Sequence, residues 1–347
     1  MQNKDIKNFT LDELEEEFKH LGERKYRATQ LFYWLYKKNV ENFTDMSNLP
    51  ITFIDFLQNN FHLSNIKLVK FTKSKDQTEK YLFKLEDGSL IESVLIFFKK
   101  RLTECISSQI GCKYNCLFCE SGKKGLVRNL SISEILNQVL FVKKKIKSNP
   151  HNIVFMGIGE PLDNYDNVIK AIGILNSKDA FNMGARKITI STCGIIPAIK
   201  RLQERNWQIE LSVSLHAPDN KLRSYLMPVN NKYPLYDLIE ACKNYTKKTK
   251  RQVTFEYVLI KGVNDSLHYA DKLAKLIIGF NSKVNLITFN PVPHSSLQPS
   301  KVIQVKDFKD KLIASGIPTT IRRSRGSDIY AACGQLKNLY QGKILDF

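Results

Sequence analysis

Two periodicities of hydrophobic positions divide the chain. Before about residue 80 the apolar positions recur at helical spacing, whereas beyond it they alternate with polar positions, as in half-buried strands. Thr10, with Glu13 three residues later, has the capping-box pattern that begins a helix. Further helices are predicted over KYRATQLFYWLYKK and, after Pro50, over ITFIDFLQNNF. We therefore expect residues 1–85 to form a small, mainly helical unit.

The second predicted helix mixes apolar and cationic side chains. The two sets are Leu31, Phe32, Trp34 and Leu35 on the one hand and Arg27, Lys37 and Lys38 on the other. Either the helix packs on one side and presents cations to phosphate on the other, or it is a plain packing helix. The first interpretation makes this unit an RNA-binding accessory domain.

The rest of the chain is typical of an α/β fold. YLFKLEDGSLIESVLIFF predicts a β-hairpin that turns at Asp87 and Gly88. Apolar strands then alternate with amphipathic helices, and the strand candidates are TECISSQ, NIVFMGIG, KITIST, IELSVSLH, VTFEYVLI, KVNLITFN and TTIRRS. This order favours a parallel sheet, closed or nearly closed into a barrel, with its site at the carboxyl ends of the strands. We assign the core to residues 86–310 and a C-terminal segment to residues 311–347.

Composition indicates the kind of binding partner and the cellular compartment. Lys and Arg number 53 against 34 Asp and Glu, so the formal net charge is +19, a field that attracts nucleic acid. A Lys-rich genome bias is the alternative explanation. The polar N-terminal stretch has no signal-peptide pattern, and no apolar run is long enough for a membrane span, so we expect a cytoplasmic protein that binds no membrane. Seven cysteines, an odd number, favour reduced thiols, metal ligation or catalysis.

Three cysteines form the strongest local signal. Cys112, Cys116 and Cys119 have C-x3-C-x2-C spacing directly after a predicted strand. Three thiolates with no fourth Cys or His nearby can hold three irons of a 4Fe-4S cluster and leave the fourth iron open for a ligand. A structural zinc site prefers four protein ligands, and a disulfide needs an oxidising compartment. The cluster is favoured, with zinc and buried thiols as the alternatives.

This loop resembles that of the radical S-adenosylmethionine (SAM) superfamily, in which the open iron chelates the cofactor and the fold is a partial (β/α)6 barrel. The resemblance implies that polar groups at successive strand ends bind SAM: Gly159 and Glu160 in GIGEP, Ser191 in ITIS, Ser214, Leu215 and His216 in SLHAP, and Asn290 in FNPVP. Taken one at a time, each is equally typical of a hydrogen-bonded strand terminus.

Over nearly its whole length the chain resembles the RlmN/Cfr family of RNA adenine methyltransferases. The segments that carry the resemblance are LGERKYRATQLFYWLYKK, ECISSQIGCKYNCLFC, GKKGLVRNL, NIVFMGIGEPLDN, RSYLMPVN and RRSRGSDIYAACGQL. The family implies that one SAM methylates Cys333 and that a second is cleaved to a 5'-deoxyadenosyl radical, so that two are consumed per turnover. That radical activates the methyl-thioether, whose carbon then adds to adenine.

The resemblance also assigns the later steps. Cys105 would attack the Cys333 sulfur and release the product by forming a disulfide, and Glu92 would act as the acid/base residue. A buried core thiol and a surface carboxylate are the plain alternatives. Cys193 and Cys242 match no catalytic position and are expected to be packed thiols, Cys193 beside the cofactor pocket.

Two branches of the family differ in the carbon that they methylate. One methylates C2 of adenine 2503 in 23S rRNA and of adenine 37 in some tRNAs, and the other methylates C8 of the rRNA base. Pro161 and the basic segment RRSRGSD favour the C2 branch. The implied partners are 23S rRNA, tRNA and an electron donor such as flavodoxin or ferredoxin, with the enzyme a monomer. A non-catalytic iron-sulfur RNA-binding protein and a glycyl-radical activase are the remaining alternatives.

Overall fold

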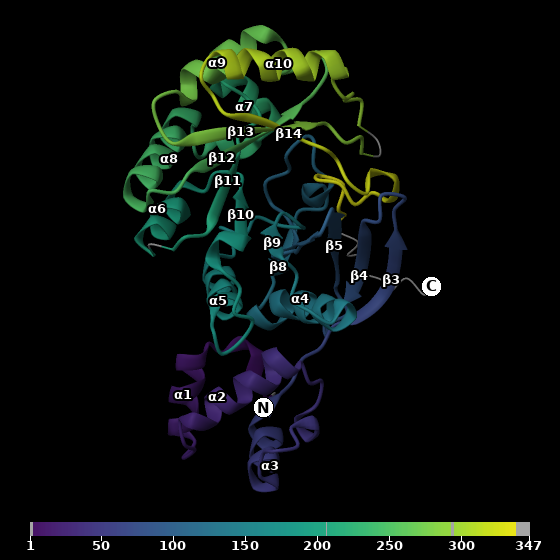
Figure 1. Ribbon diagram of the computed structural model, residues 1–347, viewed down its shortest axis with the longest axis vertical. Helices are drawn as coiled ribbons and strands as arrows, with labels where there is room; N and C mark the ends of the chain where they lie inside the picture. The colour runs from purple at the N-terminus through teal and green to yellow at the C-terminus, as the bar shows by residue number, and fades with distance from the viewer. Residues whose placement is uncertain (1–2, 206, 293–294, 338–347) are drawn as a thin grey trace.

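A curved sheet organises the molecule (Figure 1). The computed structural model describes residues 3–205, 207–292 and 295–337, so the last ten positions of the predicted C-terminal segment, 338–347, lie outside the described residues. The described residues form a ten-stranded sheet in the order β14-β13-β12-β11-β10-β9-β6-β5-β4-β3. Its strands are β3 (Lys67–Lys73), β4 (Glu79–Lys84), β5 (Leu90–Phe98), β6 (Arg101–Cys105), β9 (Asn152–Phe155), β10 (Ile188–Thr192), β11 (Glu210–Ser214), β12 (Val253–Leu259), β13 (Ser282–Thr288) and β14 (Thr319–Arg322).

The strands from β6 to β14 run parallel, as the alternation of strands and helices predicts. In Figure 1 the helices surround the outer side of the sheet: α4 (Ile132–Ile146), α5 (Tyr165–Asn176), α6 (Ile196–Glu204), α7 (Asn220–Leu226), α8 (Leu235–Thr249), α9 (Leu267–Ile277) and α10 (Val302–Ala314). Every residue of β12 is buried, including the polar residues Thr254 and Glu256. The carboxyl ends of these strands therefore meet at one edge.

The hairpin extends the sheet in the antiparallel direction. β4 pairs with β5 and β5 with β6, and the turn passes through Gly88 at a φ of +84°, a conformation that favours glycine. β3 is not anticipated by the sequence, because nearly all of its residues are exposed and no alternation marks it. Residues 67–84 thus belong to the sheet, which starts within the range expected to be helical. A small sheet of β7 (Gln109–Gly111) and β8 (Leu126–Asn129) follows β6.

The helices of the N-terminal unit lie below α4 in Figure 1. It contains β1 (Lys4–Asp5), α1 (Leu11–His20), α2 (Tyr26–Phe32), a π-helical turn (Tyr33–Lys38), α3 (Ile51–Asn60) and β2 (Phe61–His62). The capping box of α1 forms as predicted, with Thr10 Oγ1 accepting from the Glu13 amide at 3.3 Å and Glu13 Oε2 accepting from the Thr10 amide at 3.0 Å. Lys7 fastens the unit to α4 because its buried Nζ donates to Asn137 Oδ1 at 2.8 Å.

Candidate active site

The three-cysteine loop is folded tightly on itself. It follows β7 directly, and the chain turns at Asn115, which has a φ of +43°. Gly122 lies so close to this turn that an added Cβ would be 2.8 Å from the Asn115 backbone. The Leu117 amide, next to Cys116, donates to the Leu226 carbonyl at 2.9 Å. The loop is therefore held both internally and against α7.

The loop cysteines open onto a cavity of about 150 Å³ at the carboxyl ends of the parallel strands. The predicted residues that line it are Cys112, Cys116, Cys119, Gly159, Glu160, Ser191, Ser214, His216, Asn290 and Cys333. Leu215 does not line it: the side chain is fully buried, and its amide donates to the Glu256 carbonyl at 3.0 Å. The structure thus gathers most of the predicted cofactor and cluster positions in one place.

Two cavity residues are fixed by backbone hydrogen bonds. Glu160 accepts from the Cys193 amide at 2.6 Å and from the Leu162 amide at 3.0 Å, and burial raises the pKa of its carboxyl. His216 Nδ1 accepts from the Val258 amide at 3.0 Å, so the remaining ring nitrogen, Nε2, carries the proton of the neutral ring. Burial lowers the pKa of His216 to about 3, so this ring stays neutral at physiological pH.

Cys333 lies on a segment that is bound to the cluster loop. The Glu120 amide donates to the Gly334 carbonyl at 2.8 Å, and Ser121 Oγ donates to the Leu336 carbonyl at 2.9 Å. On the other side, Asn290 Nδ2 donates to the Cys333 carbonyl at 3.2 Å. These contacts bring a cysteine that is remote in sequence to the wall of the cluster cavity.

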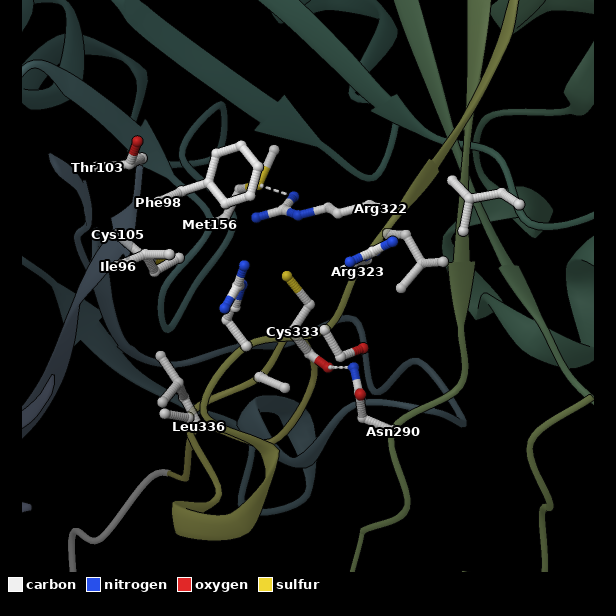
Figure 2. A pocket seen from close by; sticks show the side chains of 16 residues that line it. Ile96, Phe98, Thr103, Cys105, Met156, Asn290, Arg322, Arg323, Cys333 and Leu336 are labelled. Atoms are coloured by element: carbon white, nitrogen blue, oxygen red, sulfur yellow. Dashed lines mark hydrogen bonds between the residues drawn. The ribbon is translucent and has the colours of Figure 1, made fainter. Parts of the chain in front are cut away.

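A second cavity, of about 370 Å³, meets the first at Cys333 (Figure 2). Its lining includes Cys105, Phe98, Arg323 and Arg325. The residues that line both cavities are Met156, Ile287, Asn290, Arg322 and Cys333. In Figure 2 the Cys333 sulfur points into this cavity, toward the Arg322 side chain. The charge of Cys333 raises the pKa of Arg322, whose Nη1 donates to Met156 Sδ at 3.1 Å.

Cys105, the last residue of β6, reaches the second cavity but not the first. Burial, and after it the charge of Cys333, raises the pKa of its thiol to about 12, although Arg322 acts in the opposite direction. All seven cysteines lie within the described residues and each is a free thiol, so the disulfide implied by the family is not formed in this structure. Cys105 and Cys333 nevertheless both line the second cavity.

Glu92, which the family resemblance predicts as the acid/base residue, is neither a surface carboxylate nor a cavity residue. It is buried in β5. Its Oε1 pairs with Lys80 Nζ at 3.1 Å, and its Oε2 accepts from the Lys337 amide at 2.9 Å. In this structure Glu92 therefore anchors the segment that carries Cys333.

Several lining residues were not singled out from the sequence. Tyr114, Phe118, Met227 and Glu256 line the cluster cavity, and Phe98 lines the second one. The segment RRSRGSD was noted, but the placement of its arginines around a cavity depends on the fold. Cys193 lines the cluster cavity, beside the cofactor positions as expected, whereas Cys242 is fully buried in α8.

The donor set fits an iron-sulfur cluster. No three Cys, His, Asp or Glu side chains of the described residues are gathered closely enough to hold one metal ion together. Thiolates that bind different irons of a cluster need not share one ion, so the three loop cysteines suit a cluster. Arg223 Nε, a buried donor without a partner among the described residues, adds positive charge near Cys116, where an anionic cluster would be stabilised.

Comparison with known families agrees with this geometry. Residues 106–274 match the Radical SAM superfamily, and residues 4–62 match the Ribosomal RNA large subunit methyltransferase N-terminal domain. A crystal structure of a radical SAM methyltransferase from Sphaerobacter thermophilus superimposes with a TM-score of 0.92 at 43% identity, covering 96% of this chain and 99% of that one. Fold and site define a radical SAM enzyme, and the α/β partial (β/α)6 barrel predicted from the sequence is confirmed.

The relatives are more specific. A probable dual-specificity RNA methyltransferase RlmN of Clostridium novyi is 48% identical, covering 97% of this chain and 98% of the relative. A dual-specificity RNA methyltransferase RlmN of Campylobacter lari is 46% identical, and the match covers 96% of this chain and 98% of the relative. The chain belongs to the RlmN family of radical SAM RNA methyltransferases. In the described part of the chain, no helix has the length and apolar character that crossing a membrane requires.

Proposed function

We propose that this enzyme methylates C2 of an adenine in the peptidyl-transferase loop of 23S rRNA and of the adenine next to the anticodon in some tRNAs, through an S-methylcysteine at Cys333. One observation carries the proposal: Cys333 lies where two cavities meet, one lined by the three loop cysteines and the other by arginines and Cys105. A methyl carrier must reach both the cofactor and the target base, and this position serves both.

The first cavity would hold the cofactors. Cys112, Cys116 and Cys119 would bind three irons of one 4Fe-4S cluster, which leaves room for SAM at the fourth. When bound, the cluster supplies the electron that cleaves SAM reductively to a 5'-deoxyadenosyl radical. The strand-end residues around Glu160 and Ser214 would orient SAM toward Cys333. Two SAM molecules are consumed in each turnover, one as methyl donor and one as radical source.

Cys333 would carry the carbon. Its sulfur attacks the SAM methyl group, the carbon-sulfonium bond breaks, and its electron pair leaves with S-adenosylhomocysteine. The methyl group would then give a hydrogen atom to the 5'-deoxyadenosyl radical, which becomes 5'-deoxyadenosine, and the resulting carbon radical would add to the adenine. The adduct radical would pass its unpaired electron to a one-electron acceptor, a role that the oxidised cluster could supply, and would lose the proton of the attacked carbon, leaving an S–CH2–adenine thioether. The hydrogen bonds from Asn290 and Glu120 to this segment hold Cys333 in place throughout.

Cys105 would release the product. Its thiolate attacks the Cys333 sulfur, an S–S bond forms, and the electron pair of the broken C–S bond goes to the base-bound carbon, which takes up a proton. Glu92 would accept the proton lost from the base, once its carboxylate is freed from the Lys337 amide. A cellular thiol then reduces the disulfide. An electron donor such as flavodoxin or ferredoxin, a monomeric enzyme and a cytoplasmic location complete the proposal.

The second cavity supports RNA as substrate. Arg322, Arg323 and Arg325 line it together with Phe98, and the net charge of the chain is +19. Cations attract phosphate, and an aromatic side chain beside them is suited to stack on an unpaired base.

Nucleoside mass spectrometry tests the proposal. Purified enzyme, SAM, a reductant and unmodified 23S rRNA or tRNA should yield 2-methyladenosine in both RNAs. The same reaction with Cys333→Ala should yield none. Formation of 8-methyladenosine would instead place the enzyme in the branch that methylates C8. Product formation by the Cys333→Ala enzyme would show that Cys333 does not carry the methyl group.

A further inference from the structure

The segment RSYLMPVN carries an arginine that is buried although its side chain is cationic. Arg223 in α7 is 0% exposed. Its Nη1 donates to Asn230 Oδ1 at 3.0 Å, and its Nη2 donates to the Cys193 carbonyl at 2.7 Å and to the Ser214 carbonyl at 3.2 Å. All three acceptors are neutral, and no carboxylate of the described residues forms an ion pair with it.

Such a residue requires a compensating anion. Burying an unpaired charge is strongly unfavourable, even after the surrounding structure relaxes. Burial lowers the pKa of Arg223, but a guanidinium starts so high that it remains protonated. Arg223 Nε has no hydrogen-bond partner among the described residues. The ionisable side chains that lie close enough to raise the pKa of Arg223 are all cysteines: Cys193, Cys116 and Cys242.

Among these cysteines, Cys116 is a predicted cluster ligand. A cluster bound by thiolates carries net negative charge, which becomes more negative by one unit on reduction. The other ionisable groups around the cavity do not supply the missing anion in the same way. His216 stays neutral, Glu160 is already held by the Cys193 and Leu162 amides, and Glu256 accepts from Asn285 Nδ2 at 2.9 Å.

Arg223 also joins the two strand ends beside the cavity. Its two carbonyl acceptors, Cys193 and Ser214, follow β10 and end β11, and both residues line the cavity. Asn230 is in turn fixed, because its Nδ2 donates to Asn220 Oδ1 at 3.0 Å and to Ser224 Oγ at 2.9 Å. The guanidinium is therefore held rigidly and cannot turn toward solvent.

We propose that Arg223 is a positioning residue whose fixed, buried positive charge beside Cys116 makes the cluster easier to reduce. A cation in a low-dielectric interior stabilises the more negative, reduced cluster more than the oxidised one, which raises the reduction potential. This inference rests on the proposed function, because Arg223 would act on the cluster. The test must therefore distinguish loss of the cluster from an unchanged reduction potential.

Potentiometric titration monitored by the EPR signal of the reduced cluster provides this separation. Arg223→Gln removes the charge but keeps an amide donor, and Arg223→Lys keeps the charge. Arg251→Gln is the matched control: Arg251 pairs with Glu210 beside the amino-terminal ends of β11 and β12, away from the cavity. All proteins are reconstituted without oxygen and assayed for iron and sulfide before titration.

The expected result is a more negative midpoint potential for Arg223→Gln, with iron content unchanged, and wild-type potentials for Arg223→Lys and Arg251→Gln. A wild-type potential in cluster-loaded Arg223→Gln would overturn the role. Should Arg223→Gln not fold, Arg223→Lys decides: a clear shift there would show that charge is not what Arg223 supplies. A wild-type protein with no SAM-responsive cluster signal would instead sink the proposed function.

Discussion

The Glu120 amide donates a 2.8 Å hydrogen bond to the Gly334 carbonyl. These residues directly follow Cys119, the last cysteine of the cluster loop, and Cys333, the proposed methyl carrier, so one hydrogen bond joins the two segments. Gly334 has a φ of +83°, and a Cβ on it would lie 2.8 Å from the Phe118 carbonyl oxygen. The close approach of the carrier segment to the cluster loop therefore depends on the absence of a side chain.

Gly334→Ala should displace Cys333 from the cluster cavity. The substitution forces a left-handed backbone on alanine, at a cost of about 1–2 kcal/mol, and adds a contact with backbone that cannot yield. We expect the iron content to stay at the wild-type level and methylation of Cys333 to fall at least tenfold, measured by peptide mass spectrometry.

Gly316→Ala is the matched control. Gly316 has a similar φ of +79°, but nothing lies within 4 Å of an added Cβ. It should lose similar stability in chemical denaturation and keep full Cys333 methylation. Equal losses of methylation in both variants would mean that backbone strain alone, rather than contact with the cluster loop, is responsible.

Cys105→Ala should trap RNA on the enzyme. Without a second thiol the C–S bond to Cys333 cannot be broken by disulfide formation, so a covalent protein-RNA adduct should accumulate and be visible on denaturing gels. Cys242→Ala, another buried cysteine but in α8, should turn over normally. Free methylated RNA from Cys105→Ala at the wild-type rate would exclude the releasing role.

Product release should accelerate with pH. Burial raises the pKa of Cys105 to about 12, so the thiol is protonated at neutral pH and its thiolate fraction grows about tenfold with each pH unit. The single-turnover release rate should therefore rise by roughly 100-fold between pH 7 and pH 9. Cys105→Ala, assayed at each pH, corrects for RNA hydrolysis. A plateau that begins below pH 8 would indicate another proton donor or another limiting step.

Glu92→Gln separates two roles of this carboxylate. The amide oxygen can still accept from the Lys337 amide, so the carrier segment should stay anchored and Cys333 should still be methylated. If Glu92 takes the proton of the base, product formation should nevertheless fall at least 100-fold, in line with a lost general base. Lys80→Met, which breaks the ion pair but leaves the carboxylate, should retain activity. Normal turnover by Glu92→Gln would make Glu92 an anchor only.

Sequence patterns predict much of this fold because their signals are local. The Thr10–Glu13 capping box, the glycine turn at Gly88 and the runs of apolar residues each depend on neighbouring residues only. Parallel strands that end in polar residues then bring Ser214 and His216 to one edge. The role of Cys333, in contrast, is predicted from family resemblance and not from periodicity.

What the sequence does not show depends on long-range packing. β3 is an edge strand with exposed side chains on both faces, so it lacks the alternation that marks a strand. Arg223 reads as an ordinary helix-surface cation until the fold buries it between two strand ends. The partners of Glu92 lie on a neighbouring strand and near the end of the chain, and no local pattern joins them.

The central claim is that Cys333 carries the methyl group between two cavities. The most direct test incubates cluster-loaded enzyme, without oxygen or RNA, with SAM bearing an isotopically labelled methyl group, followed by peptide mass spectrometry. The account predicts the labelled methyl on the Cys333 peptide and on no other cysteine. An unmodified Cys333 in protein that holds its full iron and binds SAM would contradict it.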